Sequence, residues 1–365
     1  MNKIPVLLSF PRMRQILAIL SVVLGLIAVG CLTVPEPDNA DKPLDIYFLD
    51  MAGGASTLIV TPLGESILID TGSREPLHRD VDRIYRACED AGLKRIDYLL
   101  TTHFHLDHFG GILELSKRIP VRHFIDKGAP PPEHERNTDW FRRLYPLYIQ
   151  TTQGQAQPLR AGKDIPLKND PTGKIPPMRL HCVAAEKLIE SFDGDIDAPV
   201  AGFEIKKPDT TDNARSIALV LTYGRFKFFA GGDITWNIEH HLAHPVNRIG
   251  RVDLYQITHH GLDQSNNPLL LKALSPTVCV AMNGPKKGIQ PNAFRTLKAL
   301  PSVKAIYQIH YNTLYGPQGN TNPEFIANAD APQKGRYIKA SVYPQKRTFT
   351  ISINRDGPAR TYPIQ

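Results

Sequence analysis

The chain is predicted to adopt an α/β fold in which β-sheets and helices form a layered sandwich. Apolar runs with the two-residue period of strands alternate with segments of helical period, and no internal repeat interrupts the series. Of the 365 residues, 42% are hydrophobic. This content is sufficient to bury a large core, so a disordered or fibrous chain is excluded.

The predicted elements begin at residue 45. Helices are expected at residues 77–91, 109–117 and 139–148. Strands are expected at residues 45–49, 56–61, 66–69, 96–100, 179–184, 216–222, 226–229, 252–257, 277–281, 305–309, 337–342 and 348–353. Residues 126–212 carry little periodicity and are rich in Pro, Lys and Asp. We therefore expect one large domain at 45–360 with an irregular, lid-like insertion at 126–212.

The first 31 residues have the composition of an export segment. Three cations and no acid accompany an apolar run at 16–30, and a Pro-rich linker follows at 32–44. This predicts an exported protein of the periplasm or cell envelope. Cys31, preceded by Gly30, is similar to the modified cysteine of a bacterial lipoprotein. Three outcomes remain open: lipidation of Cys31, an uncleaved membrane anchor, and cleavage without either.

Charge and cysteine content exclude several classes of protein. The formal net charge is +7, and it falls to about +4 without the three cations of the export segment. This excess favours anionic partners but is too small to diagnose nucleic-acid binding. The four cysteines include no C-x-x-C pair, which excludes a zinc ribbon, a thioredoxin-like motif and a disulfide-dense scaffold.

The strongest chemical signal is the pattern H-x-H-x-D-H, which directly follows a predicted strand. Its members are His103, His105, Asp107 and His108. Chain alternation points His103 and His105 the same way. Imidazole and carboxylate ligands together suit zinc, manganese or iron, and the lack of a nearby cysteine argues against a structural thiolate site.

Four further candidate residues stand at the ends of other predicted strands: Asp70, Asp233, His259 and His260. Because the carboxyl ends of strands collect at one edge of an α/β sheet, we expect these side chains to converge on the H-x-H-x-D-H loop. A single Asp after a strand is usually a turn or helix cap. The joint occurrence of all these motifs, in this order, carries the prediction.

These motifs resemble those of the metallo-β-lactamase-fold hydrolases, in which an early Asp precedes H-x-H-x-D-H, a later G-D and a late His. Within that superfamily the sequence is most similar to the soluble domain of ComEC-type DNA-uptake proteins, from about residue 45 to 357. The similarity rests on Phe48-Leu49-Asp50, on Ile69-Asp70-Thr71-Gly72, on the stretch from Asn213 to Asp233, and on Thr258-His259-His260-Gly261. It implies an αββα sandwich. Because no polytopic membrane segment is present, it also implies a stand-alone exported relative.

The resemblance implies two divalent metal ions, with zinc favoured and manganese or iron as alternatives. His103 and His105 would hold one ion, Asp107 and His108 the second, and Asp233 would bridge them. Either His259 or His260 would complete the second site. Two cations that share a carboxylate lower the pKa of a bridging water toward neutrality and so supply hydroxide for hydrolysis.

The sequence departs from the family at its third motif, where many members carry another His. Here the position before the hairpin reads Asp212-Asn213-Ala214-Arg215-Ser216, as in the competence-type branch, which leaves the first metal site in doubt. His181 lies within an apolar strand and is predicted to be a core histidine rather than the missing ligand.

Beyond the metal ligands, Asp70, Asp107 and His310 are the expected catalytic residues. Asp70 would orient a ligand imidazole or the loop backbone. His310, at the end of another strand, is the candidate leaving-group acid. Lys286 and Lys287 follow a strand in a Gly/Pro turn and are candidate partners of a substrate phosphate.

The expected activity is metal-dependent hydrolysis of a phosphodiester or other anionic ester. Hydrolysis of a lactone, lactam or thioester at the same metal site is the alternative, and a non-catalytic binding protein with a vestigial site is the second. The partners expected are a small molecule or phosphodiester, nucleic acid without sequence-specific recognition, and a membrane contacted through the N-terminal anchor or lipid. The sequence gives no indication of the oligomeric state.

Overall fold

The computed structural model describes Met1 and residues 42–74, 76, 78–330 and 334–365. The chain divides into two units, residues 1–39 and 40–365, and the structural description concerns the second. The predicted export segment, Cys31 and most of the linker lie outside the described residues. Among the helices described, none combines the length and the apolar character needed to cross a bilayer.

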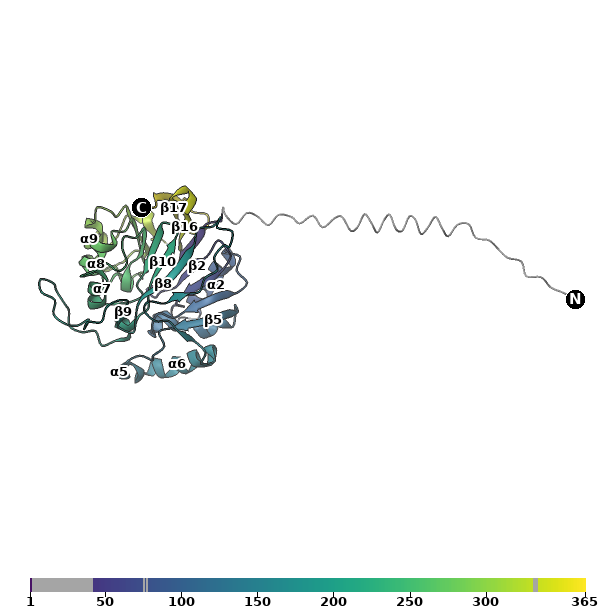
Figure 1. The fold of residues 1–365 in the computed structure, drawn as a ribbon, viewed down its shortest axis with the longest axis horizontal. Helices are drawn as coiled ribbons and strands as arrows, with labels where there is room; N and C mark the ends of the chain where they lie inside the picture. Colours follow the sequence, from purple (N-terminus) through teal and green to yellow (C-terminus); the bar gives the residue numbers. More distant parts are fainter. Residues whose placement is uncertain (2–41, 75, 77, 331–333) are drawn as a thin grey trace. The chain divides into compact units, whose positions relative to one another are not determined.

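Two large sheets form the centre of the domain (Figure 1). The first has nine strands, in the order β18 (Arg360–Pro363), β17 (Thr348–Ile353), β16 (Ile338–Tyr343), β1 (Leu44–Phe48), β2 (Thr57–Val60), β3 (Ser66–Ile69), β4 (Ile96–Leu100), β5 (Val121–Asp126) and β6 (Gln157–Pro158). Its strands from β3 to β6 run parallel, and its other neighbours are antiparallel.

The second sheet also has nine strands. Their order is β15 (Ile326–Asn328), β14 (Ala305–His310), β13 (Val278–Ala281), β12 (Leu254–Gln256), β11 (Phe226–Ala230), β10 (Ala218–Tyr223), β8 (Met178–Ala185) and β7 (Asp164–Ile165), with β9 (Leu188–Ile189) paired to β8. The strands from β11 to β15 run parallel. The hairpin β10–β11 turns at Gly224, whose φ of +58° suits glycine.

Helices cover the outer faces of the two sheets. On the first sheet lie α2 (Arg79–Asp90), α3 (Leu106–Phe109), α4 (Ile112–Ser116), α5 (Glu133–Arg136) and α6 (Asp139–Thr152); on the second lie α7 (Trp236–Ala243), α8 (Pro268–Leu274) and α9 (Pro291–Ala299). Figure 1 shows α7, α8 and α9 on one side of the strands and α2 on the other. The fold is therefore an αββα sandwich, which confirms the predicted fold class.

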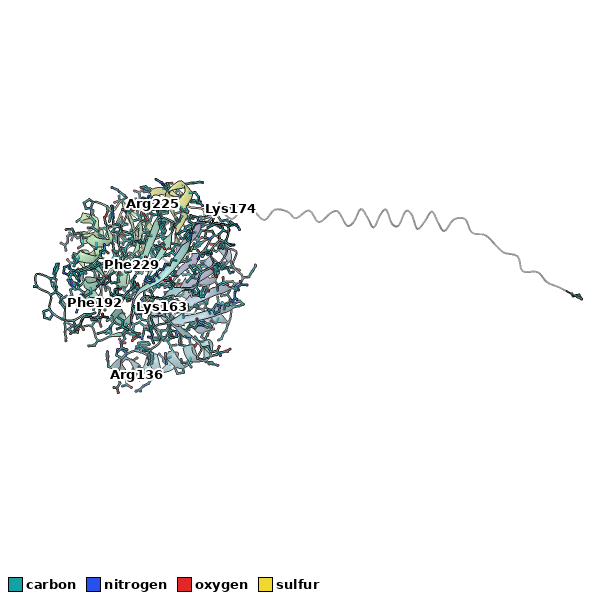
Figure 2. The ribbon with its side chains drawn as sticks, viewed as in Figure 1. Arg136, Lys163, Lys174, Phe192, Arg225 and Phe229 are labelled. Carbon is teal, nitrogen blue, oxygen red and sulfur yellow. The ribbon has the colours of Figure 1, made fainter. Side chains whose placement is uncertain are left out.

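Three apolar clusters hold these layers together. The central cluster joins the inner faces of both sheets, with Phe48 of β1 and Phe228 of β11 in edge-to-face contact at 5.8 Å. One outer cluster joins the second sheet to α7, α8 and α9 and includes Phe229, labelled in Figure 2. Alternation along β11 thus sends neighbouring phenylalanines to opposite faces, as a strand buried on both sides requires.

Residues 126–212, where a lid-like insertion is expected, contain the expected helix (α6) and strand (β8) and add further strands to both sheets. They contribute β6 to the first sheet and β7, β8 and β9 to the second, where β8 pairs with β10 along its length. Strand β8 is buried in seven of its eight positions. The sequence shows little of this because β6, β7 and β9 have two residues each, too few for a period to appear.

Several further elements lie outside the predicted set, among them β5, β15 and helices α7 to α9. These helices have eight, seven and nine residues. Helices of this length are marginal by themselves and are stabilised by packing on the sheet, so their sequences carry a weak period. The three described cysteines are buried and unpaired, Cys88 on α2 and Cys182 and Cys279 in strands.

Helix α7 carries a buried carboxyl group that makes stability depend on pH. Glu239 is fully buried, its Oε2 accepts a hydrogen bond from the Asn267 amide, and burial raises its pKa from 4.5 to about 7. A raised folded-state pKa contributes stability that is complete below pH 4.5 and is lost as the pH rises through 7. Relative to Glu239→Gln, the wild type should lose about 3 kcal/mol of unfolding free energy across that window.

Urea unfolding of both metal-free proteins between pH 5 and pH 8 measures this difference. Comparison with the variant cancels the titration of every other group that the substitution leaves unchanged. A difference in unfolding free energy that stays constant with pH would show that Glu239 does not titrate in this window.

Candidate metal centre

The site is built where parallel strands of both sheets end. Strand β3 leads into Asp70, β4 into the loop with His103, β11 into Asp233, and β12 into His259 and His260. The loops approach closely: Gly232 has a φ of +56°, and a Cβ there would lie only 3.3 Å from Thr102 Cβ. Glycine is therefore suited to this position of the G-D motif for two reasons: the backbone is left-handed, and a side chain would crowd Thr102.

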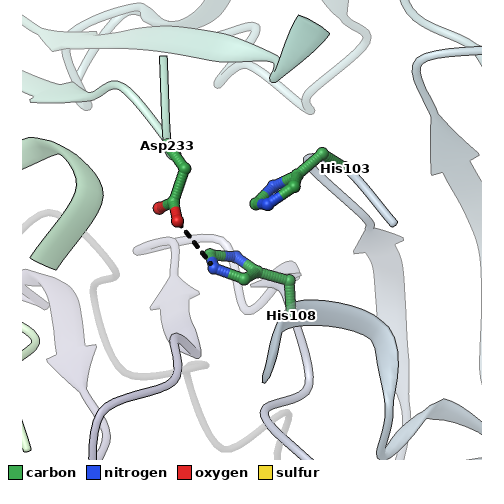
Figure 3. Close-up of side chains that lie close together, drawn as sticks. All are labelled: His103, His108 and Asp233. Carbon is green, nitrogen blue, oxygen red and sulfur yellow. Dashed lines mark ion pairs between the residues drawn. The ribbon is translucent and has the colours of Figure 1, made fainter. Parts of the chain in front are cut away.

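Three buried imidazole nitrogens have no hydrogen-bond partner at this edge. They are the Nε2 atoms of His103, His108 and His260. His103, His108 and Asp233 form one group of potential ligands, and Asp107, His108 and His260 form another. His108 Nε2 lies 3.2 Å from Asp233 Oδ2 (Figure 3). Buried polar atoms without partners are costly, so a cation is the natural partner for this set.

Asp107 and Asp233 bring the two groups together. His260 Nε2 lies 3.4 Å from a carboxylate oxygen of each, and His108 Nε2 lies 3.7 Å from Asp107 Oδ2. His259 Nε2 lies 3.5 Å from Asp233 Oδ2. Both histidines of the T-H-H-G motif therefore lie next to Asp233, and His260 alone of the two also approaches Asp107.

Hydrogen bonds at Nδ1 determine which nitrogen of each ring is available. His260 Nδ1 bonds the Met282 carbonyl oxygen at 2.9 Å, and His108 Nδ1 bonds Asp70 Oδ2 at 2.8 Å. Because both partners accept, each Nδ1 carries the proton. In the neutral ring, Nε2 is then the metal-binding atom.

The protonated nitrogen of His103 is determined in the same way, through the Thr102 hydroxyl. Thr102 Oγ1 donates its single hydrogen to Asp70 Oδ2 at 2.8 Å and lies 3.1 Å from His103 Nδ1. It can therefore only accept from His103, which leaves His103 Nε2 unprotonated. Asp70 also accepts from the Thr102 amide, and burial raises its pKa. Asp70 thus orients one imidazole directly and a second through Thr102.

His105 is held differently and is absent from both ligand groups. Its Nε2 bonds Glu135 Oε1 at 2.9 Å, which leaves Nδ1 as its only nitrogen for a metal. Its ring lies 4.7 Å from that of His103. Glu135 lies on α5 and was not found by sequence reasoning, because it stands in the segment with little periodicity and in no motif.

The charges within the cluster favour the ionised form of its carboxyl groups and the protonated form of His108. Burial by itself would raise the pKa values of Asp107 and Asp233, but the neighbouring charges, His108 first, hold them well below the usual range. Conversely, burial would lower the pKa of His108, yet Asp233, Asp107 and Asp70 raise it well above normal. A cation that binds here replaces the His108 proton.

The remaining predicted residues are placed as follows. Lys287 Nζ lies 2.5 Å from Asp107 Oδ2, whereas Lys286 is exposed. His310 is 1% exposed, and its Nε2 bonds Asp50 Oδ1 at 2.6 Å. Among the described residues its ring makes no hydrogen bond or ion pair with a metal-ligand candidate, and its role as leaving-group acid stays a prediction.

The residues that stand at the position of the family's third motif lie beside the cluster. Asn213 Nδ2 is 3.4 Å from His259 Nε2, and Asn213 Oδ1 is buried without a hydrogen-bond partner. His181 lies elsewhere, in β8, where its two ring nitrogens bond Asp164 and Glu190. It is buried, as predicted for a core histidine, but it is paired with two carboxylates rather than packed among apolar groups.

An αββα sandwich with buried His and Asp side chains converging at its strand ends has the features of a metal-dependent hydrolase. The donor set of imidazoles and carboxylates fits divalent metal ions. Residues 50–274 match the model of the metallo-beta-lactamase superfamily, and the chain belongs to that superfamily. Its members bind divalent metals, typically two, and are generally hydrolases.

Comparison with solved structures finds similar proteins at low sequence identity. A mutant of the CmlA beta-hydroxylase is 15% identical over 76% of this chain and has a TM-score of 0.41; CmlA is described as a diiron enzyme from Streptomyces venezuelae. The present chain covers 53% of that protein, about half its length. A putative metal-dependent hydrolase from Parabacteroides distasonis is 14% identical over 72% of this chain and 98% of its own, with a TM-score of 0.36. No curated protein is detectably similar in sequence.

Replacement of Asp70 by Asn should weaken metal binding by about 10- to 100-fold, as expected for a partner of metal-binding imidazoles. The amide can offer only one acceptor oxygen where Asp70 serves both Thr102 and His108. Competition with a chelating dye measures the affinity. Asp80→Asn is the matched control, since Asp80 is a buried carboxylate that bonds the Ser73 amide and Arg79. Equal affinities in the two variants would contradict the orienting role.

Proposed function

We propose that the protein is an exported metal-dependent hydrolase that acts on a phosphodiester or other anionic ester. The observation that carries the proposal is the convergence of unpaired, buried Nε2 atoms on Asp233 and Asp107. Imidazoles and carboxylates in this arrangement suit two divalent cations, zinc first. When bound, such cations supply hydroxide at neutral pH and stabilise negative charge on the attacked group.

The side chains divide this work among them. We assign His103, His105, His108, Asp107, Asp233 and one or both of His259 and His260 as metal ligands. Asp70 positions His103 and His108, and Glu135 positions His105. Lys287, which is 39% exposed at its side chain and paired with Asp107, adds a positive charge beside the site. That charge favours an anionic substrate.

The proposal extends to cellular location. The composition of residues 1–31 supports export, and the Gly30-Cys31 pair supports attachment to the cell envelope through lipid. The motif similarity to the soluble domain of ComEC-type proteins supports the choice of a phosphodiester over other esters. Mass spectrometry of the mature N-terminus tests the location, and an unprocessed Met1 in the cytosol would overturn it.

A substrate panel on the metal-loaded full chain tests the activity. The panel contains a minimal phosphodiester, a thymidine dinucleotide, a chromogenic lactam, a lactone and a thioester. We expect turnover of the diesters and a loss of at least about 100-fold in His103→Ala. His181→Ala, a buried histidine remote from the motif loop in sequence, is the control and should retain turnover. Turnover of the lactam or lactone without the diesters would assign the alternative chemistry.

Metal analysis separates the enzyme from a vestigial site. A hydrolase of this kind should retain close to two equivalents of divalent metal after native purification. Less than one equivalent, together with no turnover of any substrate in the panel, would indicate a non-catalytic binding protein.

A further inference from the structure

A cavity of about 350 Å³ opens between residues 206–211 and the first turn of α7. It is lined by hydroxyl, ammonium and amide groups, and nothing in the assigned metal centre uses them. Its volume lies in the lower range of small-ligand sites. The cavity is a candidate ligand site because hydroxyl, ammonium and amide groups form part of its lining and because its segments lead along the chain to the metal-ligand candidates.

The walls of this cavity are held in place by specific contacts. Asn237 on α7 accepts a hydrogen bond from the Lys206 amide and donates one to the Lys206 carbonyl, both at 2.9 Å. Lys206 Nζ lies 3.6 Å from the centre of the Trp236 ring and donates to the Asp263 carbonyl. The segment that carries Lys206 is therefore clamped onto α7 through both its backbone and its side chain.

One hydroxyl that lines this cavity makes no hydrogen bond within the described residues. Thr235 is 5% exposed, stands at the N-cap position of α7 and makes no side-chain capping bond. Within the described part of the chain, no hydrogen bond of its hydroxyl is found. The Trp236 amide at this helix start donates to the Gln264 carbonyl, so the Thr235 hydroxyl is the donor that remains for an anion. The helix dipole also favours negative charge there.

The charges of the lining also favour an anion. Lys206 and Lys207 face one carboxylate, that of Asp209, whose Oδ1 already accepts the Thr211 amide at 2.7 Å. Lys207 is exposed and, among the described residues, has no ion-pair partner. Ammonium and hydroxyl groups together are typical donors to phosphate oxygens.

The chain connects this cavity to the metal centre at two places. Thr235 follows Asp233 by two residues. Thr211 Oγ1 accepts the Asn213 amide at 3.3 Å, and Asn213 lies beside His259. The cavity therefore lies next to the chain segments that carry Asp233 and Asn213.

We propose that this cavity binds a second phosphate group of the substrate, one that flanks the ester to be cleaved. The inference rests on the proposed function, because it names which anionic esters the site prefers. Substrates with an additional terminal phosphate should bind more tightly than the same esters without it. The Lys207 ammonium and the Thr235 hydroxyl are the groups that distinguish them.

Binding is tested first without metal or turnover. The chain has two tryptophans, so in a Trp140→Phe background the emission reports on Trp236 alone. Titration with inorganic phosphate, against sodium chloride at matched ionic strength, should give a saturable change, since phosphate draws Lys206 from the Trp236 ring. Lys207→Gln and Thr235→Val should abolish that change. Lys174→Gln, an exposed lysine outside the cavity and labelled in Figure 2, should retain it.

The second arm compares thymidine dinucleotides with and without a 5′-phosphate on the metal-loaded protein. The phosphorylated form should have a KM about tenfold lower at similar kcat, and Lys207→Gln and Thr235→Val should remove that advantage. No saturable titration, or one that persists in both variants, would overturn the inference. Failure to cleave either dinucleotide, with the titration intact, would overturn the proposed function while the anion site stands.

Discussion

Asp233→Asn should strongly reduce the proposed hydrolysis and lower the metal content of the purified protein. Asp233 is 4% exposed and lies within 3.5 Å of His108, His259 and His260, so no other described carboxylate reaches as many of the candidate ligands. Loss of a shared carboxylate costs several kcal/mol of transition-state stabilisation, or about 10³-fold in kcat/KM. Metal content by mass spectrometry and turnover of the minimal diester measure the two effects.

Asp253→Asn is the matched control for this experiment. Asp253 is also buried, at 2% exposure, and its carboxylate accepts backbone amides of Lys227 and Gln365. That variant should lose stability but keep its metal and its turnover number. If Asp233→Asn retained two equivalents of metal and normal turnover, the proposed centre would be wrong.

Lys127→Ala should lower the unfolding free energy of the metal-free protein by about 3–5 kcal/mol. Lys127 is fully buried, and its ammonium lies 2.7 Å from Glu186 and 3.0 Å from Asp212. Its removal leaves Asp212, which is 0% exposed, without its cation, and burial already raises the pKa of that carboxyl. Urea unfolding at constant pH measures the loss.

Lys339→Ala is the control, because Lys339 pairs with Asp45 at 2.8 Å while its side chain is 23% exposed. A partly exposed pair of this kind contributes less than a fully buried one, on the order of 1 kcal/mol. Equal losses of unfolding free energy in the two variants would show that burial of the Lys127 ion pairs does not increase their contribution to stability.

The ion pair between Lys127 and Asp212 also stabilises the H-x-H-x-D-H loop. Asp212 Oδ2 accepts the Phe104 amide at 2.8 Å, between the two histidines of the motif, and the Asp212 amide donates to Glu135. Lys127→Ala should therefore weaken metal binding as well as stability, which the chelating-dye competition detects. An unchanged affinity would limit the role of Lys127 to stability.

The sequence predicted the fold class because the central strands are long enough to show their period. Strands β4, β10 and β17 have five or six residues each, and their predicted bounds agree with the observed ones to within two residues. Within 126–212 the same reasoning found α6 and β8 but missed β6, β7 and β9, strands of two residues that pair with β5 and β8. Those strands owe their existence to partners distant in the chain, which a local pattern does not record.

The sequence also identified the side chains that meet at the strand ends. The motifs named Asp70, His103, His108, Asp233 and His260 as candidates, and all five belong to one connected cluster of contacts. This succeeded because parallel strands place their following loops at one edge, so order along the chain predicts proximity.

What the sequence alone determined is therefore the αββα class and the residue types of a metal centre. Only the tertiary structure showed which residues form hydrogen bonds with the histidine rings of this centre. Glu135, Ser265 and Met282 bond ring nitrogens of His105, His259 and His260, yet none stands in a recognisable motif. It also placed His310 with Asp50 and created the cavity at Thr235. The physical reason is that ligand identity follows from residue chemistry, whereas hydrogen-bond partners depend on packing between segments far apart in the chain.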